Sequence, residues 1–289
     1  MVSDQVSVNS LFTNFRRWAL SYNEREATDL TLTTRFAPAP TGFLHLGHVL
    51  NAIWVWETAR ASGPGARVLL RIEDHDRQRS RPEFEASIRE DLEWLGFVAD
   101  GPLVRQSERH AIYEAALDTL RGRGLVYACS CSRADVASQR YPGTCAHRNL
   151  PESPGHSVRV RLDGAIERFD DMRLGRQEQQ PSAQCGDLVA KDREGNWTYQ
   201  FAATVDDWQQ NVDLVVRGED LLDSTGRQIQ LARLLGRGEP PVFLHHPLMM
   251  KSPTQKLSKS DRDTGVRELR ARGWSAPKVM AAIPRELRP

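Results

Sequence analysis

The chain has 289 residues, with 39 Lys and Arg residues against 38 Asp and Glu residues and a formal net charge of +1. This length can bury the core of one large domain with an insertion, or of two domains, and the near-neutral charge excludes a global electrostatic field that would attract nucleic acid. No stretch approaches the roughly eighteen consecutive apolar residues of a membrane span, and residues 1–30 lack the apolar core of a secretion signal. We therefore expect a soluble, cytoplasmic protein with no membrane partner and with an extension at residues 1–30.

The first predicted elements are a strand and a helix joined by a turn rich in Pro and Gly. Apolar residues alternate with polar ones over residues 30–36, which is the period of a strand, and recur at helical spacing over residues 46–54. His45 and His48 therefore stand at a helix N-terminus, where free backbone N–H groups and a partial positive charge suit phosphate. Gly47 has no side chain, so a ligand could lie directly on the backbone there.

The alternation of strand and helix continues downstream. A buried strand is predicted over residues 66–74, with Glu73 near its end, and ligands in open parallel sheets bind beyond such strand ends. Ser80 and Glu83 form a capping box for the next predicted helix, and Ser107 is the expected cap of the one after it. Strand, helix, strand, helix is the pattern of a doubly wound sheet.

The pattern breaks between about Val126 and Ala190, where turn residues, charges and all four cysteines collect. It returns with a strand over residues 212–216 and a helix over residues 224–235, and two short helices are expected after residue 265. The fold class predicted from these elements is α/β: a Rossmann-like, doubly wound parallel sheet with an inserted subdomain and a short helical C-terminal segment.

Two separated segments carry a resemblance to a known family. Residues 35–51 read Arg-Phe-Ala-Pro-Ala-Pro-Thr-Gly-Phe-Leu-His-Leu-Gly-His-Val-Leu-Asn, and residues 256–260 read Lys-Leu-Ser-Lys-Ser. The first resembles the His-x-Gly-His motif of class I aminoacyl-tRNA synthetases, and its Arg-Phe-Ala-Pro narrows the resemblance to the glutamyl branch. The second resembles the Lys-Met-Ser-Lys-Ser loop of the same family, with Leu for Met. Each motif alone could be ordinary surface histidines or a solvated loop, but both in this order favour the family.

The resemblance implies amino-acid activation, in which a carboxylate attacks the α-phosphate of ATP and expels pyrophosphate. Charge builds on oxygens that fixed donors must neutralise, and serines beside lysines suit a mobile lid over the phosphates. Magnesium is expected to accompany ATP. The residues implied as catalytic are His45, His48, Lys256 and Lys259. Those implied for ATP binding are His45, Gly47, His48 and Lys259.

The glutamyl branch also implies a pocket for an amino diacid. Arg35 and Arg217 would each hold a carboxylate, Glu73 would pair with the ammonium, and Tyr199 would add a hydroxyl and a wall. The full implied set for glutamate is Arg35, Phe36, Ala37, Pro38, Ala39, Glu73, Tyr199 and Arg217. The family often has Ser where this chain has Ala39, which puts a side-chain contact there in doubt. The alternatives for each residue alone are surface ion pairs, a strand-end salt bridge and a core aromatic. Discrimination against glutamine would rest on charge, since carboxylate and amide are nearly isosteric.

The cysteines offer a metal site. A Cys-x-Cys pair without a second Cys-x-x-Cys leaves both a metal site and buried free thiols open. Glutamyl-queuosine tRNA(Asp) synthetases show Cys-x-Cys followed by Tyr-x-x-x-Cys around a zinc, and this resemblance implies one structural zinc on Cys129, Cys131, Tyr141 and Cys145. His147 is the substitute ligand if the tyrosine is not one. Cys185 is left over, as a small buried residue.

The same resemblance gives an expected division of the chain. Residues 1–30 form the extension, 31–125 and 191–250 the two halves of the Rossmann-like catalytic domain, 126–190 the inserted zinc- and acceptor-binding subdomain, and 251–289 the Lys-Leu-Ser-Lys-Ser loop with C-terminal helices.

The length after residue 260 bears on the acceptor. Discriminating glutamyl-tRNA synthetases continue with helical domains that read the anticodon, and these would not fit in the remaining residues. We therefore expect a truncated paralogue of the glutamyl-queuosine type, a monomer that activates L-glutamate without tRNA and transfers it to queuosine in the anticodon loop of tRNA(Asp). Unpaired loops suit sequence-specific RNA recognition. The alternatives are a truncated glutamyl-tRNA synthetase charging tRNA(Glu), another His-x-Gly-His nucleotidyltransferase, and a catalytically silent paralogue.

Overall fold

The structure is a computed structural model that describes residues 32–132, 134–136, 140–252, 255–256 and 265–289. The expected extension at residues 1–30 and the proposed catalytic Lys259 lie outside the described residues. Within the described part of the chain, no helix is both long and apolar enough to cross a membrane.

The central element is a seven-stranded sheet with the order β3-β2-β1-β9-β10-β6-β7. Its strands are β1 (Thr33–Phe36), β2 (Arg67–Ile72), β3 (Val104–Arg105), β6 (Glu167–Asp171), β7 (Gly175–Gln179), β9 (Leu214–Gly218) and β10 (Val242–His246). All neighbouring pairs are parallel except β6 with β7. The predicted α/β fold with a mostly parallel sheet is confirmed.

Helices follow the parallel strands, as in a doubly wound fold. They are α2 (Leu46–Ser62), α3 (Pro82–Leu95), α4 (His110–Gly122), α5 (Pro181–Gln184), α6 (Tyr199–Gln209), α7 (Thr225–Leu234), α8 (Val266–Ala271) and α9 (Ala276–Ala281), with 3-10 turns η1 (Gln106–Glu108), η2 (Glu219–Ser224) and η4 (Arg285–Leu287). One core joins α2 to β1, β2 and β9, and includes Phe36, Leu50 and Leu214. A second core joins α4, α6 and α7.

Helix α2 is buried on most sides. Its buried residues include Trp54 and Trp56 in addition to the aliphatic residues that face the core. Indole N–H groups need acceptors when buried, and both find backbone carbonyls: Trp54 donates to Leu287 at 2.7 Å and Trp56 donates to Val98 at 2.8 Å. The helix that carries both motif histidines is therefore fixed from several directions.

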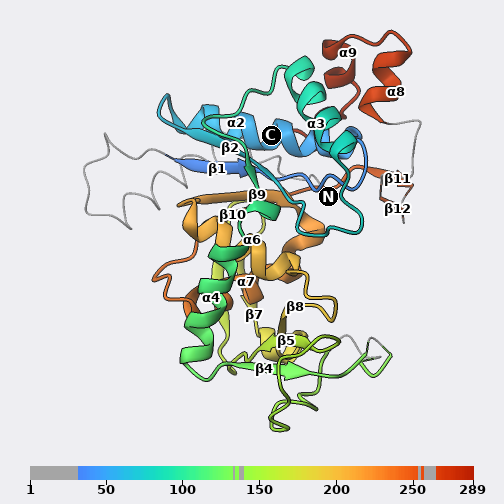
Figure 1. Cartoon of the computed structure of the whole chain (residues 1–289). Helices are drawn as coiled ribbons and strands as arrows, with labels where there is room; N and C mark the ends of the chain where they lie inside the picture. The colour runs from blue at the N-terminus through green and yellow to red at the C-terminus, as the bar shows by residue number, and fades with distance from the viewer. Residues whose placement is uncertain (1–31, 133, 137–139, 253–254, 257–264) are drawn as a thin grey trace.

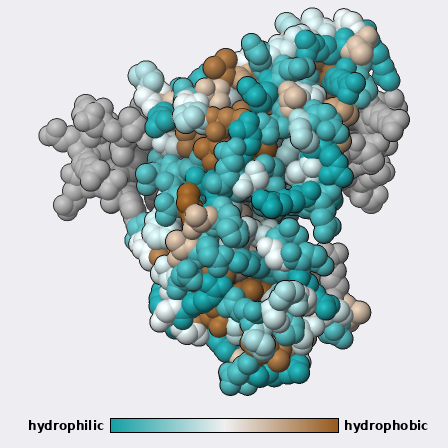
Figure 2. Space-filling view, in the orientation of Figure 1, coloured by the Kyte–Doolittle hydropathy of each residue, from teal (hydrophilic) through white to brown (hydrophobic). Residues whose placement is uncertain are grey.

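A three-stranded antiparallel sheet, β4-β5-β8, lies apart from the main sheet. It consists of β4 (Val126–Cys129), β5 (Ser157–Val160) and β8 (Leu188–Lys191), whereas β6 and β7, between β5 and β8 in the chain, extend the main sheet. Figure 1 shows β4 and β5 at one end of the molecule and α8 and α9 at the other. The face seen in Figure 2 is mostly hydrophilic, with hydrophobic residues in separate patches.

Two predicted caps are wrong. Helix α3 begins at Pro82 with Arg81 at the N-cap and no side-chain cap bond, because proline is favoured in the first turn and takes over the start from Ser80. Ser107 lies in η1, and its N–H and hydroxyl both donate to the Asp74 carboxylate, at 2.8 and 2.5 Å. Asp74 lies just after β2, so Ser107 ties two chain segments together instead of capping a helix.

Candidate functional site

A pocket of about 410 Å³ opens where β1 and β9 lie side by side in the sheet. From β1 the chain passes through α2 to β2 on one side, and from β9 it passes through α7 to β10 on the other. This reversal is the topological switch point, where open α/β sheets bind ligands beyond the carboxyl ends of their strands. The implied site residues that line the pocket are Arg35, Ala37, His45, Gly47, His48, Glu73, Tyr199 and Arg217.

Three of the residues implied for glutamate are not among those that line the pocket. Phe36 is buried in the core, with its ring centroid 5.5 Å from that of Trp56. Pro38 accepts a 3.0 Å hydrogen bond from the Glu73 N–H through its carbonyl, and Ala39 accepts one of 2.9 Å from the Thr41 N–H. Pro38 and Ala39 thus shape the loop that carries Ala37 and hold the Glu73 backbone.

His45 and His48 form the N-terminal capping box of α2. The His45 Nδ1 accepts from the Gly47 N–H at 3.1 Å, and the His48 Nδ1 accepts from the His45 N–H at 3.1 Å. Because Nδ1 is an acceptor in both rings, a neutral ring carries its hydrogen on Nε2 and is a donor there. The centroids of the two rings are 3.9 Å apart. Each ring thus caps the helix through Nδ1 and has an Nε2–H donor, which is the kind of group that phosphate oxygens require.

The backbone of the segment that carries Lys256 pairs with a strand that begins next to the pocket. In the hairpin of β11 (Met250–Ser252) and β12 (Gln255–Lys256), Met250 pairs with Lys256, and the preceding Met249 lines the pocket. At the other end of the loop, Gly265 forms a β-bridge with His45. The described residues on both sides of residues 257–264 are therefore anchored near the pocket.

Arg35 is held by a buried carboxylate that the sequence analysis missed. Its Nε donates to Asp207 Oδ1 at 3.0 Å, and the same oxygen accepts from Arg71 Nη1 at 2.7 Å. Arg71 is fully buried and its Nη2 also donates to Glu73 at 3.1 Å. Burial opposes ionisation of Asp207, but the two guanidinium groups outweigh it and lower its pKa to about 2. The sequence signal was an acidic pair, Asp206 and Asp207, in a helix whose other buried residues are mostly apolar.

Arg217 has a different environment. Among the described residues no carboxylate lies within the 4.0 Å limit of an ion pair, and three uncharged acceptors bind its guanidinium instead. These are His245 Nε2 at 3.0 Å, Gln228 Oε1 at 2.6 Å and Thr225 Oγ1 at 2.8 Å. Burial lowers the pKa of Arg217, against the effect of the nearby Tyr199, yet arginine stays charged at neutral pH. A buried cation at a pocket wall suits an anionic ligand.

The pocket continues along α2 to His246, which the sequence analysis did not single out. Its ring stacks on Trp54 with centroids 6.1 Å apart, and its Nε2 lies 2.9 Å from the Asn51 Nδ2. Burial lowers the pKa of His246 to about 4, so the ring is neutral and accepts from the amide. His246 therefore contributes a neutral aromatic ring to this end of the pocket.

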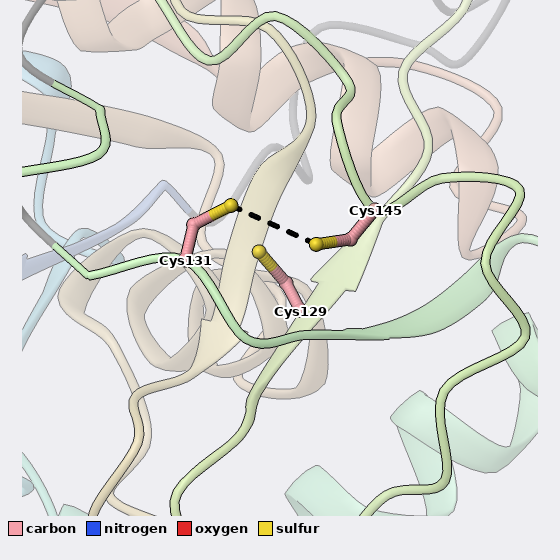
Figure 3. Close-up of side chains that lie close together, drawn as sticks. All are labelled: Cys129, Cys131 and Cys145. Carbon is pink, nitrogen blue, oxygen red and sulfur yellow. Dashed lines mark hydrogen bonds between the residues drawn. The ribbon is translucent and has the colours of Figure 1, made fainter.

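The three cysteines implied as metal ligands converge, as Figure 3 shows. Their sulfur atoms all lie within 4.8 Å of one another, and the Cys131 and Cys145 sulfurs are 3.6 Å apart. The Tyr141 hydroxyl accepts from the Cys145 N–H at 2.8 Å and lies 3.5 Å from the Cys129 sulfur. Burial and hydrogen bonds to the other thiols raise the pKa of Cys131 to about 12, so three thiolates here would require a cation. The donor set fits zinc, which prefers thiolate ligands.

The two spare candidates lie outside this cluster. His147 is exposed, and its ring is not among the groups whose ligand atoms converge. Cys185 is half-buried, its thiol donates to the Pro181 carbonyl at 3.2 Å, and its own carbonyl accepts from the Tyr141 N–H at 3.0 Å. Cys185 therefore supports the segment that carries Tyr141 without taking part in the cluster.

Comparison with known proteins adds an independent line of evidence. Residues 31–284 match the family described as "tRNA synthetases class I (E and Q), catalytic domain". The chain is 39% identical over 279 residues to the Glutamyl-Q tRNA(Asp) synthetase of Rhodobacter capsulatus, covering 87% of this chain and 99% of the relative. It is 45% identical over 239 residues to the protein of the same name from Burkholderia mallei, covering 78% and 79%.

Solved structures give the same fold. A glutamate tRNA ligase from Elizabethkingia meningosepticum, in complex with its amino acid, superposes with a TM-score of 0.69 at 29% identity. The match covers 81% of this chain and 53% of the ligase, so the chain spans about half of that larger protein.

Proposed function

The chain belongs to the class I glutamyl- and glutaminyl-tRNA synthetase family, and from this premise we propose that it activates L-glutamate with ATP in the absence of tRNA and transfers it to queuosine in tRNA(Asp). As a member of this family it is a ligase-type enzyme. The observation that carries the glutamate assignment is Arg217, a buried guanidinium at the pocket wall with no carboxylate within ion-pair distance among the described residues. An anionic group of the ligand would balance its charge.

Arg217 and Arg35 line one pocket with Glu73, so two cations and one anion are available there to a ligand, and Asp220 also lines the pocket. A glutamate molecule has the complementary pattern of two carboxylates and one ammonium. In our proposal the α-carboxylate oxygen attacks the α-phosphorus of ATP, the bond to the pyrophosphate oxygen breaks, and a glutamyl-adenylate results. His45 and His48 donate to the phosphates from the N-terminus of α2, and Lys256 and Lys259 neutralise charge on the leaving pyrophosphate. Magnesium accompanies ATP.

The acceptor is proposed from the relatives, whose printed name is Glutamyl-Q tRNA(Asp) synthetase. The rival acceptor is tRNA(Glu), because the matched solved structure is a glutamate tRNA ligase. The coverage favours queuosine: 99% of the Rhodobacter protein is matched, against 53% of the ligase.

Labelled glutamate, ATP and bulk tRNA from cells with and without queuosine test the acceptor. We expect label only in the queuosine-containing tRNA, on tRNA(Asp). Equal labelling of both samples would refute queuosine as acceptor and leave glutamate activation intact. Pyrophosphate exchange with ATP, run without tRNA, tests activation separately, and an absolute requirement for tRNA or a preference for glutamine would contradict it.

We also propose a structural zinc ion held by Cys129, Cys131 and Cys145, with Tyr141 as the fourth ligand. The sulfur atoms already lie within 4.8 Å of one another, and the tyrosine hydroxyl is directed into the cluster by its bond from the Cys145 N–H. When bound, zinc would link β4 to the segment around residue 145, and no step of the reaction passes through it.

A further inference from the structure

His245 contacts Arg217 without being one of the residues that line the pocket. The His245 ring is fully buried, and its Nε2 lies 3.0 Å from the Arg217 Nε and 3.1 Å from the Thr225 hydroxyl. An arginine Nε–H can only donate, so the His245 Nε2 must accept. The hydrogen of a neutral His245 ring is then on Nδ1, which lies 2.7 Å from Asp171 Oδ2. Burial lowers the pKa of His245, which agrees with a neutral ring.

Asp171, at the end of β6, is a rigid anchor for this ring. Its Oδ1 accepts from the backbone N–H groups of Arg173 and Leu174, at 3.0 and 2.8 Å. Its Oδ2 accepts from the backbone N–H of His245 at 3.0 Å, in addition to the ring. The carboxylate is buried and all these contacts are donors to it, so its position is fixed.

The resulting series of hydrogen bonds runs from an anion through a neutral ring to a cation. The negative charge of Asp171 offsets part of the buried charge of Arg217 from one residue away. Because Asp171 does not contact Arg217 itself, it does not compete with a ligand carboxylate for the guanidinium. A protein carboxylate bonded directly to Arg217 would compete with the ligand. The contrast with Arg35, which bonds Asp207 directly, shows that the fold uses both arrangements.

We propose that Asp171 and His245 are positioning residues that hold Arg217 in the orientation that accepts the substrate carboxylate and rejects the amide of glutamine. The inference rests on the proposed function, since it concerns glutamate in the same pocket. A guanidinium presents only donors, so an amide NH2 placed against it would leave two donors facing each other. This discrimination needs a fixed guanidinium, because a mobile one could turn to contact the amide oxygen.

Asp171→Asn is the first test. Either orientation of the new amide sets its NH2 against backbone N–H donors or against the His245 ring, so the anchor is lost. In tRNA-free pyrophosphate exchange we expect the KM for glutamate to rise on the order of tenfold to a hundredfold, with the KM for ATP nearly unchanged. We also expect the preference for glutamate over glutamine to fall. Asp91→Asn is the matched control, a buried aspartate on α3 outside the pocket, and should leave the KM for glutamate unchanged.

Two substitutions of His245 separate positioning from simple packing. His245→Gln can place its carbonyl oxygen where Nε2 accepts from Arg217, whereas His245→Asn can keep the donor to Asp171 but is too short to reach Arg217. We expect the glutamine variant to retain most of the glutamate affinity and the asparagine variant to lose it. Thermal unfolding of each variant checks that it is folded.

The outcomes are distinct. A wild-type KM for glutamate in Asp171→Asn, equal increases in the KM for glutamate and ATP, or identical behaviour of the two His245 variants would each overturn the positioning role. Absence of glutamate-dependent exchange by the unaltered protein would instead refute the proposed function, before any variant is compared.

Discussion

At the scale of single residues, the two pocket arginines balance their buried charge in different ways. Arg35 bonds Asp207 at 3.0 Å, whereas Arg217 bonds His245, Gln228 and Thr225. Arg35 therefore has a partner whether or not a ligand is bound. Arg217 gains more from an anionic ligand, since burying a charge is costly until it is paired. We expect glutamate affinity to depend more on Arg217 than on Arg35.

Arg217→Lys should raise the KM for glutamate roughly a hundredfold, because lysine keeps the charge but loses the planar fork that bonds three acceptors and a carboxylate together. The loss corresponds to about 2–3 kcal/mol, the usual contribution of charged hydrogen bonds. Pyrophosphate exchange at varied glutamate concentration measures it. Arg105→Lys, which alters a surface pair with Glu85, serves as control. Equal KM values for the two variants would contradict this role of Arg217.

Gly47→Ala should disrupt the capping box of α2. The new Cβ would lie 2.9 Å from His45 Cε1 and 3.0 Å from His45 Nδ1, too close for the ring to keep its bond to the backbone. We expect a loss of about 1 kcal/mol in the free energy of unfolding, typical of a lost cap, together with a raised KM for ATP. Gly122→Ala, in α4 with nothing within 4 Å of its Cβ, should lower neither the free energy of unfolding nor the affinity for ATP. An unchanged KM for ATP in Gly47→Ala would argue against nucleotide binding at this cap.

At the scale of elements, α3 carries a buried carboxylate next to the C-terminal helices. Asp91 has an Arg270 nitrogen 3.9 Å away on α8, and its carboxylate accepts a 3.4 Å bond from Ser87. Burial outweighs the attraction of Arg270 and raises the pKa of Asp91 to about 6. A raised carboxyl pKa means that folding favours the protonated form, so this contribution to stability is full below about pH 4 and is lost as the pH rises through 6.

Asp91→Asn should therefore stabilise the protein at pH 8 by roughly 1–3 kcal/mol and have little effect at pH 4. The asparagine is neutral at every pH and avoids the cost of a buried charge. Thermal unfolding at the two pH values measures the difference. Destabilisation at pH 8 would show that the ion pair with Arg270 outweighs burial.

The cysteine cluster joins β4 to the segment around Tyr141. If zinc binds there, a chelator should lower the melting temperature and release one zinc per chain, because a metal that binds only the folded state stabilises it. Cys131→Ser should weaken zinc retention, and Cys185→Ser should not, since Cys185 lies outside the cluster. Metal analysis of the purified protein checks both. Full zinc content in Cys131→Ser would exclude it as a ligand.

At the scale of the whole molecule, one buried network joins separate parts of the chain. Asp207 on α6 links Arg35 on β1 and Arg71 on β2, while the neighbouring Asp206 accepts from Gln106, Arg109 and Tyr113, at 2.8, 2.6 and 2.8 Å. The first half of the sheet is thereby tied to α4 and α6.

This network should control acid unfolding. The pKa of Asp207 is lowered to about 2 from 3.8, so its contribution to stability is present above about pH 4 and is lost as the pH falls to 2. The difference corresponds to roughly 2 kcal/mol. Asp207→Asn should remove this pH dependence and destabilise the protein at neutral pH, as denaturant titrations between pH 2 and pH 7 would show. If the stability of Asp207→Asn fell at acidic pH as steeply as that of the unaltered protein, the lowered pKa of Asp207 would be contradicted.

Local patterns predicted the α/β class, the position of α2 and the strand that precedes Glu73, because the spacing of apolar residues and of motif residues is a local property of the sequence. They could not predict that Asp207 bonds Arg35, since that contact spans 172 positions in the chain. Nor could they reveal Asp171 and His245, which reach the pocket only through Arg217. The caps at Ser80 and Ser107 failed because Pro82 and Asp74 compete for the same roles. The expected role of Lys259 falls outside the described residues and stays a prediction.

The C-terminal segment packs back onto the start of the catalytic fold. Gly265 bridges His45, the Val266 N–H donates to the Leu44 carbonyl at 2.8 Å, and Leu287 accepts the indole hydrogen of Trp54. During translation, α2 must therefore emerge from the ribosome long before the residues that brace its N-terminus exist. A nascent chain ending before residue 265 would have both histidines and none of these three contacts, so we expect nucleotide affinity to appear only late in synthesis.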